Sequence, residues 1–194
     1  MAERTLVQWF KESVEKYADN VLMWEKKTDQ YEGATYREIA DKVEKFAAGL
    51  MSFGIEKGDR IALIAEGRNE WVIAELGILH TGAIDVPMSV KINEPADLKF
   101  RLAHSGCRMV VVSANQSHKV LQIEKDLPDL EKIIVLDEID EKRQEIITLK
   151  ALYAAGEAFL VANRDALQQR IDNIKEDDPV NICYTSGTTA DPKG

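Results

Sequence analysis

The chain has 194 residues, 45% of them hydrophobic and 30% charged, which is ordinary globular composition and enough for one large or two small domains. Its 25 basic and 34 acidic side chains give a net charge of −9, which argues against a general nucleic-acid binder. No apolar run approaches the ~18 residues that span a membrane, and the N-terminus lacks a signal-peptide pattern. We therefore expect a cytoplasmic protein that binds small molecules, with peripheral attachment to a membrane left open.

The first elements are predicted to be a helix and a hairpin. Apolar side chains recur at helical spacing over residues 6–17, and Thr5 with Gln8 matches a capping box at the start of this helix. VLMWEK (21–26) is typical of a strand, and TDQYEGA (28–34) of a turn or hairpin.

The second helix has the clearest sequence pattern in the chain. Thr35 and Glu38 form a second capping box, and apolar residues then repeat at alternating spacings of four and three as far as Phe53. Gly54 suits the left-handed conformation that ends many helices. Residues 56–60, EKGDR, follow as a turn.

Beyond this turn, apolar runs alternate with helical stretches. Uninterrupted Val/Ile runs indicate strands buried on both faces, as in a parallel sheet. We expect strands at 60–66, 83–89, 108–114, 132–138 and 180–185, and helices at 69–80 (capped by Asn69), 93–106 (started by Asn93 and Pro95), 116–126, 148–155 and 158–172. This order predicts an α/β fold, a mainly parallel sheet flanked by helices.

The predicted elements divide the chain into three parts. Residues 1–58 form a helical and hairpin lead-in, 59–178 an alternating strand–helix core, and 179–194 a last strand followed by a polar loop. The charge run DEIDEKRQE (137–145) is interpreted as a solvated loop.

Several side chains that often carry chemistry have a plainer interpretation here. Cys107 and Cys183 lie in apolar stretches without metal-ligand spacing, which favours reduced core thiols. Arg68 and Asn69 follow a strand at the edge where open α/β sheets bind ligands, although capping and solvation are the favoured interpretation. Packing is the interpretation for Trp9, Trp24 and Trp71, and a helix-surface position or interior packing is the interpretation for His80, His104 and His118.

The last ten residues, TSGTTADPKG (185–194), have the composition of a phosphate-binding loop. Small residues let successive backbone N–H groups point at an anion, hydroxyls add neutral donors, and a lysine adds a point charge. The candidate phosphate contacts are Thr185, Ser186, Gly187, Thr188, Thr189, Lys193 and Gly194. The pattern is not a Walker A loop, because Pro192 precedes the lysine and glycine follows it. A polar surface turn is the alternative on composition alone.

At this point the residues match a known pattern. YTSGTTADPKG (184–194) resembles the phosphate-binding signature of the adenylate-forming (AMP-binding) superfamily, usually Y/F-T-S-G-S/T-T-G-x-P-K-G, and departs from it at Ala190, where the family has glycine. Residues 35–88 resemble the N-terminal block of the same family. Within it, EWVIAELGIL (70–79) is most similar to long-chain fatty acyl-CoA synthetases.

The resemblance implies an ATP-dependent acid–CoA ligase. In that family a carboxylate attacks the α-phosphate of Mg-ATP to give an acyl-adenylate and pyrophosphate, and the thiol of CoA then displaces AMP. The signature loop wraps the β- and γ-phosphates, so the seven candidate residues are implied phosphate contacts and Lys193 the principal catalytic residue. The implied substrates and cofactors are ATP, Mg²⁺, CoA and a fatty acid.

The resemblance also places the adenine pocket, the magnesium-binding glutamate, the ribose-binding aspartate and a C-terminal lysine in later parts of family members. We therefore expect residues 1–194 to be the N-terminal part of a large domain, without a metal site and inactive alone. Open apolar surface predicts homo-oligomers or aggregation, and residues 186–194 are expected to be mobile. Two alternatives remain: a non-catalytic nucleotide-binding or interaction module derived from the same fold, and a phosphotransferase.

Overall fold

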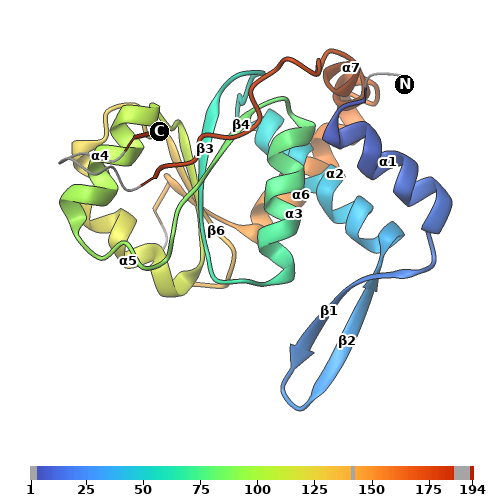
Figure 1. Cartoon of the computed structure of the whole chain (residues 1–194), viewed down its shortest axis with the longest axis horizontal. Coiled ribbons are helices and arrows are strands. Elements are labelled where there is room, and N and C mark those ends of the chain that lie inside the picture. The colour runs from blue at the N-terminus through green and yellow to red at the C-terminus, as the bar shows by residue number, and fades with distance from the viewer. Residues whose placement is uncertain (1–3, 141–142, 186–192) are drawn as a thin grey trace.

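The computed structural model describes residues 4–140, 143–185 and 193–194. Within these residues, five parallel strands form one sheet in the order β4-β3-β5-β6-β7, and helices cover both of its faces (Figure 1). The strands are β3 (Arg60–Ile64), β4 (Ile84–Pro87), β5 (Met109–Val112), β6 (Lys132–Val135) and β7 (Ile146–Thr148). The predicted fold class, α/β with a mainly parallel sheet flanked by helices, is confirmed.

Each strand sends alternate side chains into two separate cores. Ile61 and Leu63 of β3 pack with Phe46 beneath α2 (Tyr36–Ser52), α3 (Asn69–His80) and α6 (Leu149–Ala162). Ala62 and Ile64 pack on the opposite face beneath α4 (Pro95–Ser105) and α5 (Ala114–Ile123). Because both faces are covered, the strands read as continuous apolar runs rather than as alternating patterns.

The N-terminal helix and hairpin stand apart from the sheet. Helix α1 (Leu6–Tyr17) packs beside α2, and strands β1 (Val21–Lys27) and β2 (Gln30–Thr35) form an antiparallel hairpin that projects from the body (Figure 1). Both predicted capping boxes are present, with the Gln8 amide donating to Thr5 Oγ1 over 3.2 Å and the Glu38 amide to Thr35 Oγ1 over 3.3 Å. Gly54 has φ of 84°, as its predicted role at the end of a helix requires.

Several predicted boundaries are wrong. Asn69 and Asn93 are not caps, because the N-cap positions are taken by Arg68 and Glu94, neither of which makes a side-chain capping bond. The predicted break near residue 157 lies instead after Ala162, since Gly156 is inside α6. The remaining helical pieces are a 3₁₀ turn at Glu124–Asp126 and α7 (Ala166–Asp172). Strand β7 was not predicted, because it has only 3 residues and adjoins a charged stretch.

The predicted strand at 180–185 is only partly formed. The Asp85 amide donates to the Val180 carbonyl and the Ile182 amide donates to the Asp85 carbonyl, both over 2.9 Å, so this segment starts to pair in parallel beside β4. The segment lies at the edge of the sheet and is not buried as expected. For the same reason Cys183 is exposed, whereas Cys107 is a buried thiol as predicted.

Two of the three tryptophans are also not packed as expected. Trp71, in α3, is partly buried against the core. Trp9 and Trp24 are 58% and 62% exposed, because α1 turns Trp9 to solvent and the hairpin carries Trp24 away from the body.

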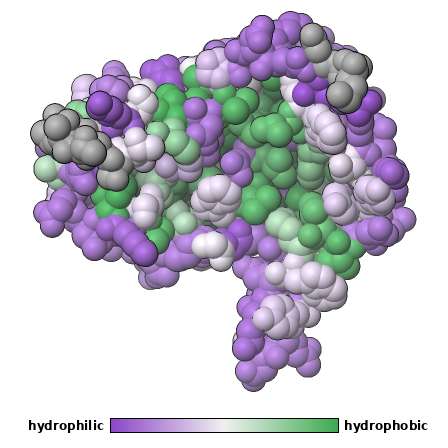
Figure 2. Space-filling view, viewed as in Figure 1, coloured by the Kyte–Doolittle hydropathy of each residue, from purple (hydrophilic) through white to green (hydrophobic). Residues whose placement is uncertain are grey.

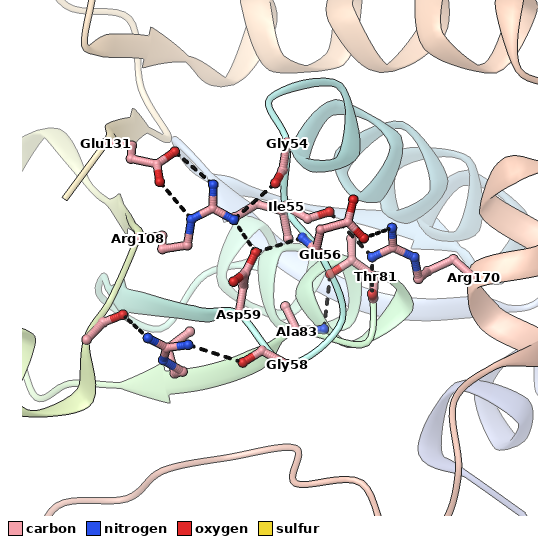
Figure 3. A network of polar contacts seen from close by, with 12 residues as sticks. Gly54, Ile55, Glu56, Gly58, Asp59, Thr81, Ala83, Arg108, Glu131 and Arg170 are labelled. Atoms are coloured by element: carbon pink, nitrogen blue, oxygen red, sulfur yellow. Dashed lines mark hydrogen bonds and ion pairs between the residues drawn. The ribbon is translucent and has the colours of Figure 1, made fainter. Parts of the chain in front are cut away.

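Two arginines, Arg108 and Arg170, form hydrogen bonds and ion pairs with the turns that precede the strands (Figure 3). Arg108 bonds both carboxylate oxygens of Glu131, at 2.7 and 3.0 Å, and pairs with Asp59. Arg170 of α7 reaches Glu56 at 2.5 Å and the Thr81 carbonyl at 3.3 Å. These arginines are satisfied by the chain itself, which indicates a structural role in holding the turns against the sheet.

Candidate functional site

The two ends of the predicted phosphate loop lie side by side. The Thr185 amide donates to the Lys193 carbonyl over 2.9 Å, and the Lys193 amide donates to the Thr185 carbonyl over 3.2 Å. This reciprocal pair is an antiparallel bridge that closes a loop of seven residues. We call this pair the neck of the loop. The candidate contacts inside the loop, Ser186, Gly187, Thr188 and Thr189, lie outside the described residues, as does most of the segment expected to be mobile.

Tyr184 fastens the neck to helix α4. Its hydroxyl donates to the Arg101 carbonyl over 3.2 Å and lies 2.7 Å from His104 Nδ1. Because a phenol has one proton and gives it to the carbonyl, the ring proton of His104 belongs on Nδ1 and donates to the Tyr184 oxygen. Partial burial raises the pKa of Tyr184, so the hydroxyl keeps its proton.

Gly194 completes this attachment from the other end of the loop. A Cβ at this position would lie 2.7 Å from the Tyr184 ring, closer than a carbon contact permits. The backbone of Gly194 therefore lies directly against the ring of Tyr184, the residue that precedes Thr185. Lys193, which forms the neck with Thr185 and precedes Gly194, is exposed to solvent. The arrangement holds both ends of the loop and leaves the lysine available to an anion.

A second candidate lies where the strand order reverses, beyond the carboxyl ends of β3, β5 and β6. Open α/β sheets often bind ligands at such a point. Here Arg68 pairs with both Glu70 and Asp137, each at 2.7 Å, and the other Asp137 oxygen accepts the Ala114 amide at the start of α5. Arg68 is neutralised by the chain, so among the described residues it is not a free cation for a phosphate.

These contacts also change the interpretation of the charge run at 137–145. We expected a solvated loop, but Asp137 joins the ends of two strands, and Arg143 pairs with Glu124. The described part of this segment is otherwise a largely exposed loop, as predicted, and the two pairs were missed because the partners lie far away in the sequence. Arg68 has a structural role here, in line with the favoured interpretation from the sequence.

An apolar pocket lies between the N-terminus of α1, the start of β4 and the segment that follows α7. It has a volume of about 340 Å³ and is lined mainly by apolar side chains, including Leu6, Val7, Leu79, Ala83, Ile174 and Val180. Figure 2 shows apolar residues gathered in the middle of this face. Leu6 and Val180 are 58% and 38% exposed, so the pocket opens to solvent.

Two further properties of the described residues bear on function. In residues 4–140, 143–185 and 193–194, no cluster of three or more His, Cys, Asp or Glu side chains could hold a metal ion. Over the same residues, no helix is both long and apolar enough to cross a bilayer.

The sequence did not reveal what holds the loop in place. The sequence predicts His104 only as a helix-surface or packing residue and does not single out Arg101, yet both contact Tyr184 from about eighty positions earlier in the chain. His104 also stacks on Phe100, with ring centroids 5.4 Å apart. The only sequence signal was the helical spacing of Phe100 and His104, four residues apart on one face of a helix.

Known proteins match the chain over nearly its whole length. A family model described as AMP-binding enzyme matches residues 10–194. The long-chain-fatty-acid–CoA ligase ACSBG2 of Xenopus laevis is 30% identical over 197 residues, which cover 98% of this chain and 25% of that protein. The chain therefore spans about a quarter of the length of the curated relatives it matches.

Solved structures show the same fold. The anthranilate CoA ligase AuaEII, solved with anthranoyl-AMP, aligns with a TM-score of 0.75 and 18% identity over 99% of this chain and 34% of that one. A long-chain-fatty-acid-CoA ligase (FadD1) from Archaeoglobus fulgidus aligns with a TM-score of 0.74 and 17% identity over 99% of this chain and 36% of that one. At this level of identity the likeness establishes the fold, which matches the N-terminal region of adenylate-forming enzymes.

Proposed function

The chain belongs to the AMP-binding enzyme family, and on this premise we propose that it is the ATP-phosphate-binding part of an acid–CoA ligase that activates a long-chain fatty acid. The observation that carries the proposal is the neck between Thr185 and Lys193. It brings together the two ends of a motif that departs from the family signature only at Ala190. The similarity to ACSBG2, a long-chain-fatty-acid–CoA ligase, supports the choice of a long-chain substrate.

In the proposed reaction, a carboxylate oxygen of the fatty acid attacks the α-phosphorus of ATP. The bond from that phosphorus to the bridging oxygen breaks, and pyrophosphate leaves with the added negative charge. The thiolate of CoA then attacks the acyl carbon, and AMP leaves. Magnesium would accompany ATP and screen the phosphate charge.

The chain's own residues would act on the leaving pyrophosphate. Thr185, Ser186, Gly187, Thr188, Thr189 and Gly194 would supply hydroxyl and backbone donors, and Lys193 a positive charge. Donors held in place before the reaction stabilise developing charge without reorganisation, and the loss of one raises a barrier by about 2.7–4 kcal/mol. The attachment of Tyr184 to α4 would keep these donors aimed during the step.

We further propose that residues 1–194 do not adenylate by themselves. The resemblance places the adenine, ribose and magnesium contacts in later parts of family members. The isolated chain should bind phosphate weakly and turn over no ATP.

ATP–pyrophosphate exchange tests the proposal directly. The product of the complete gene, incubated with a panel of fatty acids, should exchange pyrophosphate into ATP only when a long-chain acid is present. Lys193→Ala should lower the exchange rate about 10²–10³-fold, the usual effect of losing one transition-state donor. Lys150→Ala, which removes an exposed lysine on α6, is the matched control and should leave the rate unchanged.

The outcomes separate the alternatives. Exchange that survives Lys193→Ala would remove the lysine from the proposed role. The absence of exchange with every acid, together with retained binding of ATP, would assign the chain to the non-catalytic nucleotide-binding alternative.

A further inference from the structure

Helix α6 has an apolar side that the rest of the described chain does not cover. Only two of its 14 residues are charged, Lys150 and Glu157. A helix that is apolar all round is normally buried on every side, because a solvated face carries polar side chains. Its inner side is buried at Leu152 and Gly156. On the outer side Val161 is 86% exposed, more than any other large apolar side chain of the described residues.

The exposed residues of α6 lie on one side of the helix, because they recur every three or four positions. They are Lys150, Ala151, Ala154, Glu157, Ala158, Val161 and Ala162, and we call them the outer face. Three of its alanines and Val161 form a central row with the spacing of a coiled-coil seam. The two charged residues are seven positions apart, so both lie on the same flank of this row.

The central row fits a second copy of itself when the two helices run antiparallel. In that register Ala151 lies opposite the partner's Val161. Ala154 lies opposite the partner's Ala158, so alanines meet near the two-fold axis and a larger side chain meets an alanine at each end. Alanines at the centre of a helix crossing allow two helix axes to approach closely.

The charges of the outer face are complementary in the same register. Lys150 lies beside the partner's Glu157, and the two-fold axis repeats this pair on the other side. A parallel pair would place Lys150 beside Ala155 and Glu157 beside Ala162, with no opposite charge in reach. Ion pairs on the flanks of a coiled coil set the direction of its helices, so these two residues select the antiparallel arrangement.

Both charged side chains are available to a partner. Lys150 is exposed and forms no hydrogen bond or ion pair with the described residues. Glu157 pairs with Lys45 at 2.8 Å, but its side chain is 58% exposed, so a second cation can reach the carboxylate. Lys45 also pairs with Asp41 at 2.9 Å. A lysine from a partner would therefore complete a network with two charges of each sign.

An open hollow beside α6 adds apolar surface to the outer face. It has a volume of about 480 Å³ and lies between α6 and the segment that ends β6, with Leu136, Leu149 and Tyr153 in its lining. The Tyr153 hydroxyl has no hydrogen-bond partner among the described residues. A partner on the outer face would cover this hollow as well as the central row.

We propose that two copies of this chain associate through the outer face of α6, with the two helices antiparallel. A two-fold interface must be complementary to itself, and the central row and its charges both meet this condition. One helix of 14 residues buries less area than a standard interface, so we expect a weak dimer with a dissociation constant of about 0.1 mM. This inference does not depend on the proposed ligase activity.

Sedimentation equilibrium of the 194-residue chain, at about 0.01–1 mM protein, should show monomer and dimer in exchange. Lys150→Glu sets acids against acids, and Glu157→Lys sets bases against bases. Each variant should therefore raise the dissociation constant about tenfold. An equimolar mixture of the two variants should regain the wild-type affinity, because every lysine again meets a glutamate. Lys125→Glu, an exposed lysine that follows α5 on the other face of the sheet, is the matched control and should leave the affinity unchanged.

Four results would overturn the proposal. One is a wild-type chain that stays monomeric over the whole concentration range. A second is a dimer that neither charge reversal weakens, with both variants shown by circular dichroism to be folded. The third is a mixture of the two variants that associates no better than either alone. The fourth is an Ala154→Cys thiol, in the product of the complete gene, that stays protected from a maleimide at high dilution, which would show that another part of that protein covers the outer face.

Discussion

Asp85 is a carboxyl group buried in β4 with an exposed fraction of 1%. Neither of its carboxylate oxygens has a hydrogen-bond partner among the described residues. Burial, with a smaller contribution from the charge of Glu75, raises the pKa of Asp85 to about 8. His80 has the opposite shift, because burial lowers its pKa to about 4 while its Nδ1–H donates to the Leu76 carbonyl.

These two groups predict an unusual pH dependence of stability. Below the unfolded His pKa of about 6.5, the unfolded state gains a proton at His80 while the folded state keeps one at Asp85, so the two effects oppose each other. Between pH values of about 6.5 and 8, Asp85 is the only one of these two groups whose protonation differs between the folded and unfolded states. There the folded state holds a proton that the unfolded state has lost, and stability falls by about 1.4 kcal/mol per pH unit.

Denaturant unfolding at a series of pH values should show this fall. Asp85→Asn should remove it, because an amide needs no proton to stay neutral, and the variant should exceed the wild type in stability above pH 8. Asp29→Asn, at the exposed turn of the hairpin, is the control and should keep the wild-type slope. A fall of equal size in Asp85→Asn would show that Asp85 is not the group responsible.

At the scale of elements, α2 and α6 cross at a pair of glycines. A Cβ on Gly156 would lie 2.0 Å from the Lys45 carbonyl, and a Cβ on Gly49 would lie 2.5 Å from the Leu152 carbonyl. The two backbones are therefore in direct contact, and the ion pair of Lys45 with Glu157 spans the same crossing at 2.8 Å. This contact holds α6 over the sheet face that buries Phe46.

Gly156→Ala tests whether packing or helix propensity decides at this crossing. Propensity alone predicts stabilisation of about 1 kcal/mol. The contact with Lys45 predicts destabilisation of about 1–3 kcal/mol, because the helices must move apart. Thermal or urea unfolding gives the sign. Ala158→Gly, on the exposed side of α6, isolates the propensity effect, and a stabilised Gly156→Ala would refute the close contact.

Elements were predictable from the sequence where two local signals agree. The second helix combines a capping box at Thr35, apolar spacing and Gly54, and the structure has it at Tyr36–Ser52. Local signals failed where the structure of a segment depends on the elements packed around it. The segment 180–185 has the composition of a buried strand, but it lies beside β4 at the edge of the sheet. β7 is too short for any periodicity to appear.

At the scale of the whole molecule, the order of strands and the attachment of the loop were beyond the sequence. Alternating elements predict a parallel sheet, but the placement of β3 between β4 and β5 depends on which face each helix covers. The motif at 184–194 identified the candidate loop, whereas the contacts of Tyr184 with Arg101 and His104 come only from folding. A motif can be recognised from adjacent residues, whereas the residues that hold it in place lie far from it in the sequence.

The whole account depends on the loop closed by Thr185 and Lys193 binding phosphate. Titration of the isotope-labelled 194-residue chain with inorganic pyrophosphate, followed by amide resonances, tests this most directly. We predict that the largest shifts fall on Gly187, Thr188 and Gly194, and that Lys193→Ala weakens binding about tenfold or more, as expected for loss of a charge-assisted contact. Shifts confined to other parts of the chain, or an affinity unchanged in Lys193→Ala, would contradict the account.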